Sequence, residues 1–171
     1  MFSAKSAWAD SPPYGRCALG RRLLFLAICL GLLAPATLPV HAAGARTIVV
    51  LNDRGGSVID RARLIQKYQA AGTRLEIRGN FCLSACTMYL GLSNACIASN
   101  TVFGFHGPSS RMYGIGLRPE VFERWSRIMA DHYPEPLKSW FLQTGRHRTV
   151  GFHLYSGSQL IGMGITPCSP G

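Results

Sequence analysis

From residue 47 onward, short apolar runs alternate with stretches in which apolar residues recur at helical spacing. Residues 47–51, TIVVL, form a β-branched run that predicts a buried strand. Within residues 57–72, Val58, Ala62 and Ile65 fall on one face of a helix, and the stretch ends at a glycine. A strand followed by an amphipathic helix is the repeating unit of α/β proteins.

The remainder of the chain continues this alternation. The clearest helix covers residues 118–133, where apolar residues recur at i, i+4 and i+7 from Val121. The pattern also predicts strands over 74–78, 96–98 and 101–105, a turn at Gly79-Asn80, a helix in the later part of 81–92, a flexible loop over 106–116, and helices over 136–142 and 156–164. We therefore expect a single α/β domain.

The N-terminal region has the three parts of a secretory signal. An apolar run over residues 23–40 follows a basic segment and is followed by Val40-His41-Ala42, a small-residue cleavage site. The alternative is a retained membrane anchor, since the run is close to the lower limit of about 17 residues for a spanning helix. Pro35 and Pro39 favour cleavage. We expect residues 1–42 to be a signal peptide and 43–171 to be a periplasmic or secreted domain, which contacts membrane only if the segment is uncleaved.

The charge balance bears on which classes of partner the protein can bind. The chain carries 18 Lys and Arg against 8 Asp and Glu, a net charge of +10. Nucleic-acid-binding proteins gather such charge on one face beside aromatic residues, whereas these basic residues are scattered. The pattern is typical of a solvated surface, and we expect no nucleic-acid partner.

Six cysteines are present, of which Cys17 and Cys29 lie in the predicted signal peptide. The mature part keeps four, at Cys82, Cys86, Cys96 and Cys168. An even number in an exported domain predicts disulfides, with three pairings open. A zinc site is the alternative, but the spacing lacks paired C-x2-C motifs, so we expect no metal.

Three short features together supply the parts of acyl-transfer chemistry. Gly55-Gly56 follows a predicted strand, Ser84 enters a predicted helix, and His106 ends a predicted strand. Serine becomes a nucleophile when a base takes its proton, and histidine is the usual base. Exposed backbone N–H groups at the glycine turn and at Ala85, after the serine, are suited to bind an oxyanion.

The segments that carry these features resemble a known superfamily. LNDRGGSVIDRARLIQKY, GNFCLSACTMYLGL and CIASNTVFGFHGPSS are similar to the Clp protease/crotonase superfamily, and in particular to small exported ClpP-like serine peptidases of Gram-negative bacteria. SGSQLIGMGI resembles the terminal helix of that family. The resemblance implies a ββα-spiral domain with Ser84 as nucleophile and His106 as base. It also implies that Gly56 and Ala85 supply the oxyanion N–H groups, supported by Gly55 in the turn.

The chain departs from the family pattern at three places, one of which is Leu83, where the family has a small Ala or Gly before the serine. Asp53-Arg54 stands where the family has Ser-Pro, which brings a charge pair next to the site. Family peptidases commonly carry an Asp shortly before the terminal helix, where this chain has the uncharged and basic residues 145–149. No carboxylate follows Glu135, and Asp131 is expected to be a solvated charge at a helix end.

Three functional hypotheses follow. The first is an exported serine hydrolase, a peptidase acting on peptides or proteins without a cofactor. The second is a catalytically inactive binding or assembly module, motivated by the missing acid. The third gives a thiol role to Cys82 or Cys86. Since self-association is common in the superfamily, a homo-oligomer is also expected, whereas an ATP-driven unfoldase and acyl-CoA are not expected outside the cytoplasm.

Overall fold

The computed structural model describes residues 46–110 and 115–170, all within one unit of the chain that begins at residue 41. The predicted signal peptide over residues 1–42 and the middle of the predicted loop after His106 lie outside the described residues. Within the part of the chain that is described, no helix is both long enough and apolar enough to cross a membrane.

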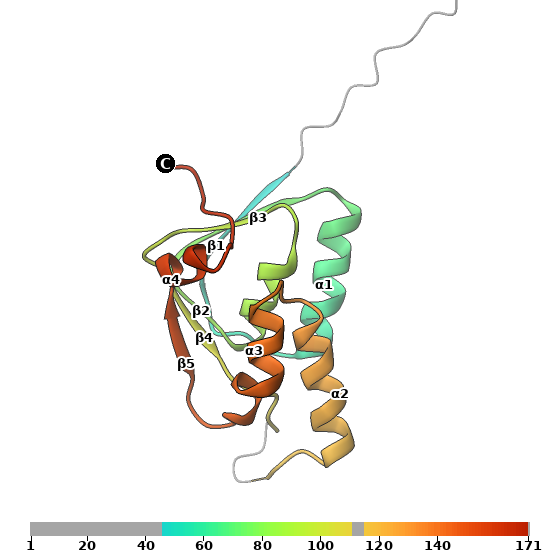
Figure 1. Cartoon of the computed structure of the whole chain (residues 1–171). Helices are drawn as coiled ribbons and strands as arrows, with labels where there is room; N and C mark the ends of the chain where they lie inside the picture. Colours follow the sequence, from blue (N-terminus) through green and yellow to red (C-terminus); the bar gives the residue numbers. More distant parts are fainter. Residues whose placement is uncertain (1–45, 111–114, 171) are drawn as a thin grey trace, which may run out of the picture. The chain divides into compact units, whose positions relative to one another are not determined.

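A five-stranded mixed sheet forms the centre of the fold (Figure 1). Its strands are β1 (Thr47–Asp53), β2 (Arg74–Leu83), β3 (Ala95–Ile97), β4 (Val102–Phe105) and β5 (His153–Ser156). One edge of β2 pairs in parallel with β1, and its other edge pairs in parallel with β3 and then with β4. β5 lies antiparallel to β4. The parallel arrangement brings the carboxyl ends of β1, β2 and β4 to the same side of the sheet.

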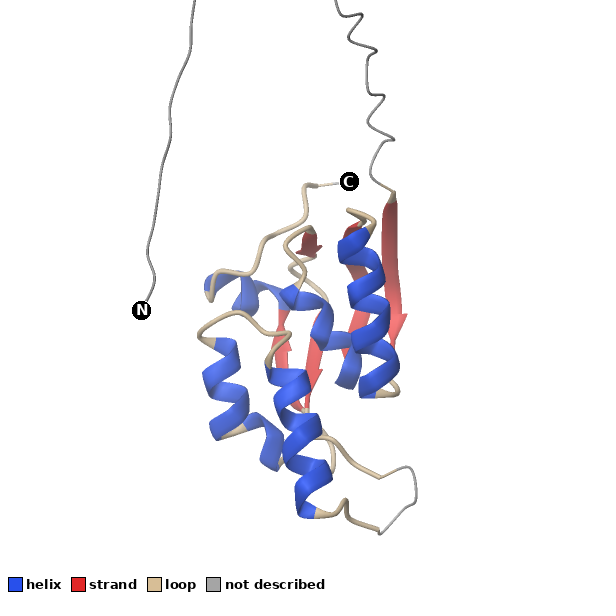
Figure 2. Cartoon of the chain, turned by 90° about the vertical axis from the view of Figure 1, so that its right-hand side faces the viewer, coloured by secondary structure: helices blue, strands red, loops and turns tan. Residues whose placement is uncertain are grey.

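Helices cover one face of this sheet (Figure 2). They are α1 (Val58–Ala70), α2 (Pro119–Ala130), α3 (Leu137–Gln143) and α4 (Gly157–Gly162), together with the 3-10 helices η1 (Ser84–Gly91) and η2 (Gly145–His147). α1 begins where the Ser57 side chain accepts a hydrogen bond from the N–H of Asp60, as an N-cap does. The mixed α/β class predicted from the sequence is confirmed.

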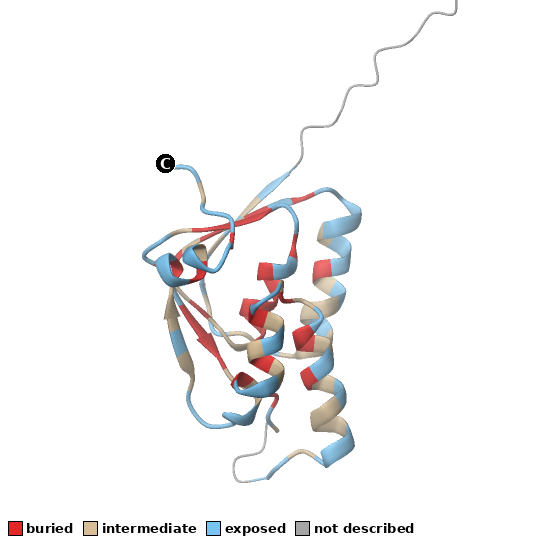
Figure 3. Cartoon of the chain, viewed as in Figure 1, coloured by how far each residue is buried: buried red, intermediate tan, exposed pale blue. Residues whose placement is uncertain are grey.

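The core lies between the sheet and the helices, with η1 at its centre (Figure 3). All six residues from Ala85 to Leu90 are buried. They pack with fully buried side chains of the sheet and helices, among them Leu75, Ile77, Phe103, Phe105, Met129 and Phe141. Because η1 is enclosed on every side, the turn that leads into it from β2 has little freedom to move.

β2 continues through Gly79-Asn80, so the turn predicted there is wrong. A Cβ added at Gly79 would lie 0.7 Å from the carbonyl oxygen of Leu51, which shows that glycine is needed for the close approach of β1. The Asn52 side chain accepts a hydrogen bond from the N–H of Asn80 at 2.9 Å, beside a register shift in β1. The glycine therefore marks a bulge within the sheet.

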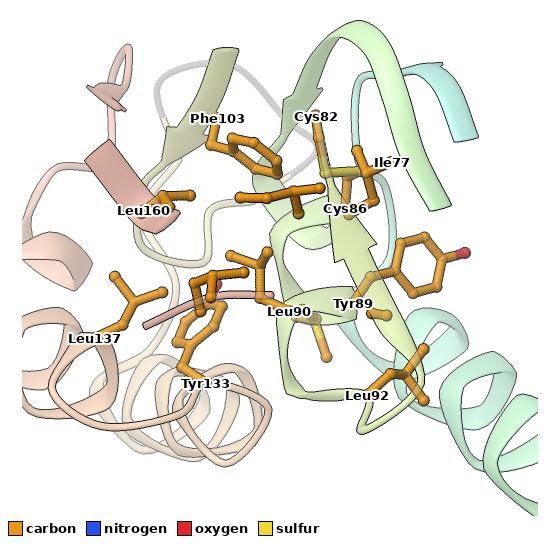
Figure 4. Close-up of a cluster of buried hydrophobic side chains, with 14 of the residues drawn as sticks. Ile77, Cys82, Cys86, Tyr89, Leu90, Leu92, Phe103, Tyr133, Leu137 and Leu160 are labelled. Carbon is orange, nitrogen blue, oxygen red and sulfur yellow. A yellow bond between two sulfur atoms is a disulfide. The ribbon is translucent and has the colours of Figure 1, made fainter. Parts of the chain in front are cut away.

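Two disulfides join the four cysteines of the mature part, which confirms the prediction of disulfide bonds and selects one of the three pairings. Cys82 pairs with Cys86 inside the core, and Cys96 pairs with Cys168 (Figure 4 shows the first pair). The second bond ties the C-terminal tail to β3, where the N–H of Cys168 also donates to the carbonyl of Ile97. Both bonds are compatible with an oxidising, exported location.

Loss of the tail disulfide is expected to destabilise the fold strongly. Replacing Cys96 and Cys168 together by alanine removes a cross-link that spans 72 residues of chain. The unfolded chain regains the conformational entropy that the cross-link had removed. The free energy of unfolding therefore falls by about 4 kcal/mol. Urea unfolding of the oxidised proteins measures this loss, and a loss below about 1 kcal/mol would contradict the account.

Candidate active site

Ser84 occupies a sharp turn between β2 and η1. Its φ of +54° makes it the one non-glycine among the described residues in the left-handed region. This conformation costs an ordinary L-residue about 1–2 kcal/mol, so the surrounding structure must impose it. The disulfide between Cys82 and Cys86 spans the turn, and both cysteines are fully buried. The turn therefore holds the Ser84 side chain at the end of β2 on a fixed backbone.

Gly55 brings the turn after β1 against Ser84. A Cβ at Gly55 would lie 2.5 Å from the Cβ of Ser84 and 2.9 Å from the backbone nitrogen of Ala85, and its φ is +97°. Only glycine satisfies both the contact and the conformation. The close approach places the glycine turn and the first residues of η1 side by side.

The charge pair expected at Asp53-Arg54 forms with a different arginine. Asp53 accepts a hydrogen bond from the N–H of Gly55 at 2.7 Å and pairs with Arg61 of α1 at 2.7 Å. The guanidinium of Arg61 also donates to the carbonyl of Gly55 and lies over the ring of Tyr89. Arg54 instead stacks over Phe81. The Asp53–Arg61 pair thus fixes the shape of the glycine turn.

Two backbone N–H groups beside Ser84 are available to a ligand. The N–H of Gly55 is taken by Asp53, but no described residue accepts a hydrogen bond from Gly56 or from Ala85. A Cβ built on Gly56 would meet no atom within 4 Å, so this residue faces open space. Exposed donors of this kind stabilise negative charge on an oxygen that develops during a reaction.

His106, directly after β4, lies within hydrogen-bond distance of Ser84. Its Nε2 is 2.6 Å from the Ser84 Oγ. Burial lowers the pKa of His106 below its ordinary value of 6.5, against a smaller opposite effect from the backbone of Gly107. The imidazole is therefore neutral at pH 7 and able to accept the serine proton.

The chain after His106 is held by a second contact network. The N–H of Gly107 donates to the carbonyl of Arg148 at 2.8 Å, and the Arg146 side chain pairs with Glu123 of α2 at 2.7 Å. These bonds join the segment after β4 to η2 and to α2. They hold Gly107 in place, and the backbone of Gly107 is in turn hydrogen-bonded with the His106 ring.

No carboxylate in residues 46–110 and 115–170 hydrogen-bonds to the ring of His106. Asp131 pairs with Lys138 at the exposed end of α2, and Glu135 bonds to Ser139. The ring is instead in edge-to-face contact with Phe152, with 5.0 Å between the two centroids. No local pattern in the sequence predicted this contact with a phenyl ring.

A cavity of about 540 Å³ opens beside Ser84 and His106. Its apolar lining comes from the first turn of α1, from the two ends of the loop after β4 and from α2, with the residues Val58, Ile59, Pro108, Leu117, Trp125 and Met129. The polar lining consists of Gly56, Ser57, Ser84, His106, Ser109 and Ser110. None of these described lining residues is charged. The volume lies in the range of small-molecule and peptide-side-chain pockets.

The four cysteines within the described residues are joined in disulfides and so offer no free thiol. Cys82 and Cys86 are joined in a disulfide and have no exposed surface, which argues against the thiol hypothesis. Glu76 lies near Cys96 and Cys168, but these two sulfurs are bonded to each other and are not available as thiolate ligands. The groups beside the cavity that could take part in a reaction are therefore Ser84, His106 and the free backbone N–H groups.

Comparison with protein-family models, with curated proteins and with solved structures finds no match to this chain. The resemblance to the Clp protease/crotonase superfamily therefore stays a prediction.

The contact between Gly55 and Ser84 can be tested by a matched pair of substitutions. Gly55→Ala adds steric overlap to a strained φ and is expected to lower the free energy of unfolding by about 3 kcal/mol. Gly72→Ala has a positive φ of +61° with no neighbour within 4 Å, so strain alone should cost about 1 kcal/mol. If urea unfolding shows the same loss of free energy for both variants, the contact between Gly55 and Ser84 is not close enough to exclude a Cβ.

Proposed function

We propose that this protein is an exported serine hydrolase that uses a Ser84–His106 dyad. The observation that carries the proposal is the 2.6 Å separation of Ser84 Oγ and His106 Nε2. The dyad lies beside two backbone N–H groups, of Gly56 and Ala85, that no described residue uses. Nucleophile, base and oxyanion donors are thus present in one place.

The geometry supports a two-step acyl transfer. His106 takes the proton of Ser84 as the oxygen attacks a carbonyl carbon, and the N–H groups of Gly56 and Ala85 bind the resulting oxyanion. The protonated histidine then gives its proton to the leaving group, which departs and leaves an acyl-serine. Water deprotonated by His106 hydrolyses this ester and restores the serine.

The cavity favours substrates with an apolar group next to the reacting carbonyl. Its described lining combines aliphatic side chains with Trp125, and no charged side chain contributes to it. A charged group would lose its hydration there without gaining a partner. We therefore propose peptides or proteins as substrates, cleaved beside an apolar residue, and no cofactor.

The proposed fold is the ββα-spiral of the Clp protease/crotonase superfamily. It is supported by the order of the features along the chain, with the glycine turn after β1, the serine after β2 and the histidine after β4. We also propose self-association. Val49, Leu51, Val102 and Leu154 are exposed on strands β1, β4 and β5, and an exposed apolar sheet surface favours contact with another protein.

A binding module without turnover is the second candidate. It is favoured by the ring of His106, which contacts Phe152 where hydrolases generally have a carboxylate. In that case the cavity would hold an apolar segment of a partner protein without cleaving it. The two candidates differ in one property, which is the reactivity of Ser84.

Labelling with a fluorophosphonate probe measures that reactivity without knowledge of the substrate. We expect the oxidised protein to be labelled at one site, and Ser84→Ala and His106→Ala each to reduce the labelling rate by at least about 10²-fold. Ser93→Ala, at an exposed serine outside the cavity, should leave the rate unchanged. A folded wild-type protein that is not labelled would favour the binding module.

The pH dependence of labelling follows from the environment of His106. Because burial lowers the pKa of His106 below 6.5, the neutral base persists to lower pH than in an exposed histidine. The rate should be constant above pH 7 and should fall on acidification with a midpoint below 6.5. A midpoint above that value, measured by stopped-time labelling between pH 5 and 8, would contradict the buried, neutral base.

A further inference from the structure

The register between β4 and β5 places Phe152 directly across from His106. In this antiparallel pair Gly104 lies opposite Leu154, and Phe105 lies opposite His153. The next pair in the same register is His106 with Phe152. Directly opposed side chains in an antiparallel pair lie close enough to pack, and these two rings have a centroid distance of 5.0 Å and an interplanar angle of 89°.

Gly104 makes the space that Phe152 occupies. Side chains two residues apart on a strand share a face, so position 104 lies next to His106 on the same side of β4. A Cβ at Gly104 would lie 2.5 Å from the Cδ2 atom of Leu83 and 3.0 Å from the Cγ and Cδ1 atoms of Phe152, so both side chains share this space. The phenyl ring therefore lies over the bare backbone of β4 and packs against His106 from there.

The charged side chains on the elements around His106 form ion pairs with each other. On the glycine turn and α1, Asp53 pairs with Arg61, and between η2 and α2, Arg146 pairs with Glu123. The η1 helix carries no acidic or basic residue, and Tyr89, its titratable group, packs under the Arg61 guanidinium.

The remaining groups lie on the strand and the segment next to Phe152. In β5, His153 is packed against Trp140. In the segment that precedes Phe152, the side chain of Arg148 is exposed and its backbone carbonyl accepts from Gly107. The His106 ring thus has an aromatic contact with Phe152 and a hydrogen bond with the backbone of Gly107, besides its contact with Ser84.

A catalytic histidine needs a third group that fixes its orientation. A carboxylate in that place both orients the ring and stabilises its charged form. A phenyl ring orients by packing alone and keeps water away, and it does not stabilise the imidazolium. Packing against a phenyl ring therefore favours the neutral imidazole and lowers its pKa, whereas a carboxylate raises the pKa.

We propose that Phe152 is a positioning residue of the Ser84–His106 dyad, whose ring packs edge-to-face against the imidazole and holds it toward the serine. This inference rests on the proposed function. It explains how the dyad works without an acid, and it predicts a base that remains available in mildly acidic surroundings.

The experiment measures fluorophosphonate labelling of the oxidised full chain as a function of pH for wild type, Phe152→Ala, Phe152→Tyr and Phe152→Asp. The alanine variant should lose about 10-fold in plateau rate and show a midpoint nearer 6.5, because water reaches the ring. The tyrosine variant keeps the ring and should retain both wild-type values. The aspartate variant should raise the midpoint by about one pH unit or more, because a carboxylate favours the imidazolium.

The pKa of His106 can also be followed by NMR of the imidazole nitrogens, which does not depend on turnover. If wild type is labelled but the alanine variant has the same rate and midpoint, Phe152 only packs and the inference is wrong. If folded wild type is not labelled at all, the proposed function fails instead. Should Phe152→Ala not fold, Phe152→Leu keeps the apolar volume without the flat ring, and a plateau rate equal to that of wild type would show that the ring does not position the imidazole.

Discussion

The conformation of Ser84 depends on the burial of the residues on both sides of it. Cys82 and Cys86 are fully enclosed, are bonded to each other and leave the serine between them in the left-handed region. Cys82 belongs to a strand that is paired on both edges, and Cys86 belongs to a helix at the centre of the core. The energy of packing thus imposes a backbone conformation that serine would not adopt in an isolated chain.

The buried turn at Ser84 also determines which groups lie next to the serine. Gly55 approaches the turn closely because it has no side chain, and the Asp53–Arg61 pair fixes that approach from α1. His106 reaches Ser84 because β2 and β4 are parallel neighbours, whose carboxyl ends lie side by side. The Asp53 carboxylate near the site bonds within the glycine turn, while the His106 ring packs against Phe152.

The sequence predicted those features that depend on local pattern. The periodicity of residues 57–72 and 118–133 located the helices that appear as α1 and α2, and the cysteine count predicted disulfides. It failed at Gly79-Asn80, because glycine marks a turn and a close strand contact equally well. It missed β5 and Phe152, since both depend on pairing with β4, a long-range register that no local pattern encodes. The grouping of Gly56, Ser84, Ala85 and His106 was expected from their order, and the roles assigned to them remain predictions.

The central claim is that Ser84 is an activated nucleophile, and trapping of an acyl-enzyme tests it most directly. The oxidised protein would be mixed with a p-nitrophenyl ester of an apolar acyl group, quenched in acid within seconds, digested and mapped by mass spectrometry. The account predicts a single acyl group on the peptide that contains Ser84, and no acyl group when His106 is replaced by alanine. Acylation of other residues only, or no acylation of the folded protein, would contradict it.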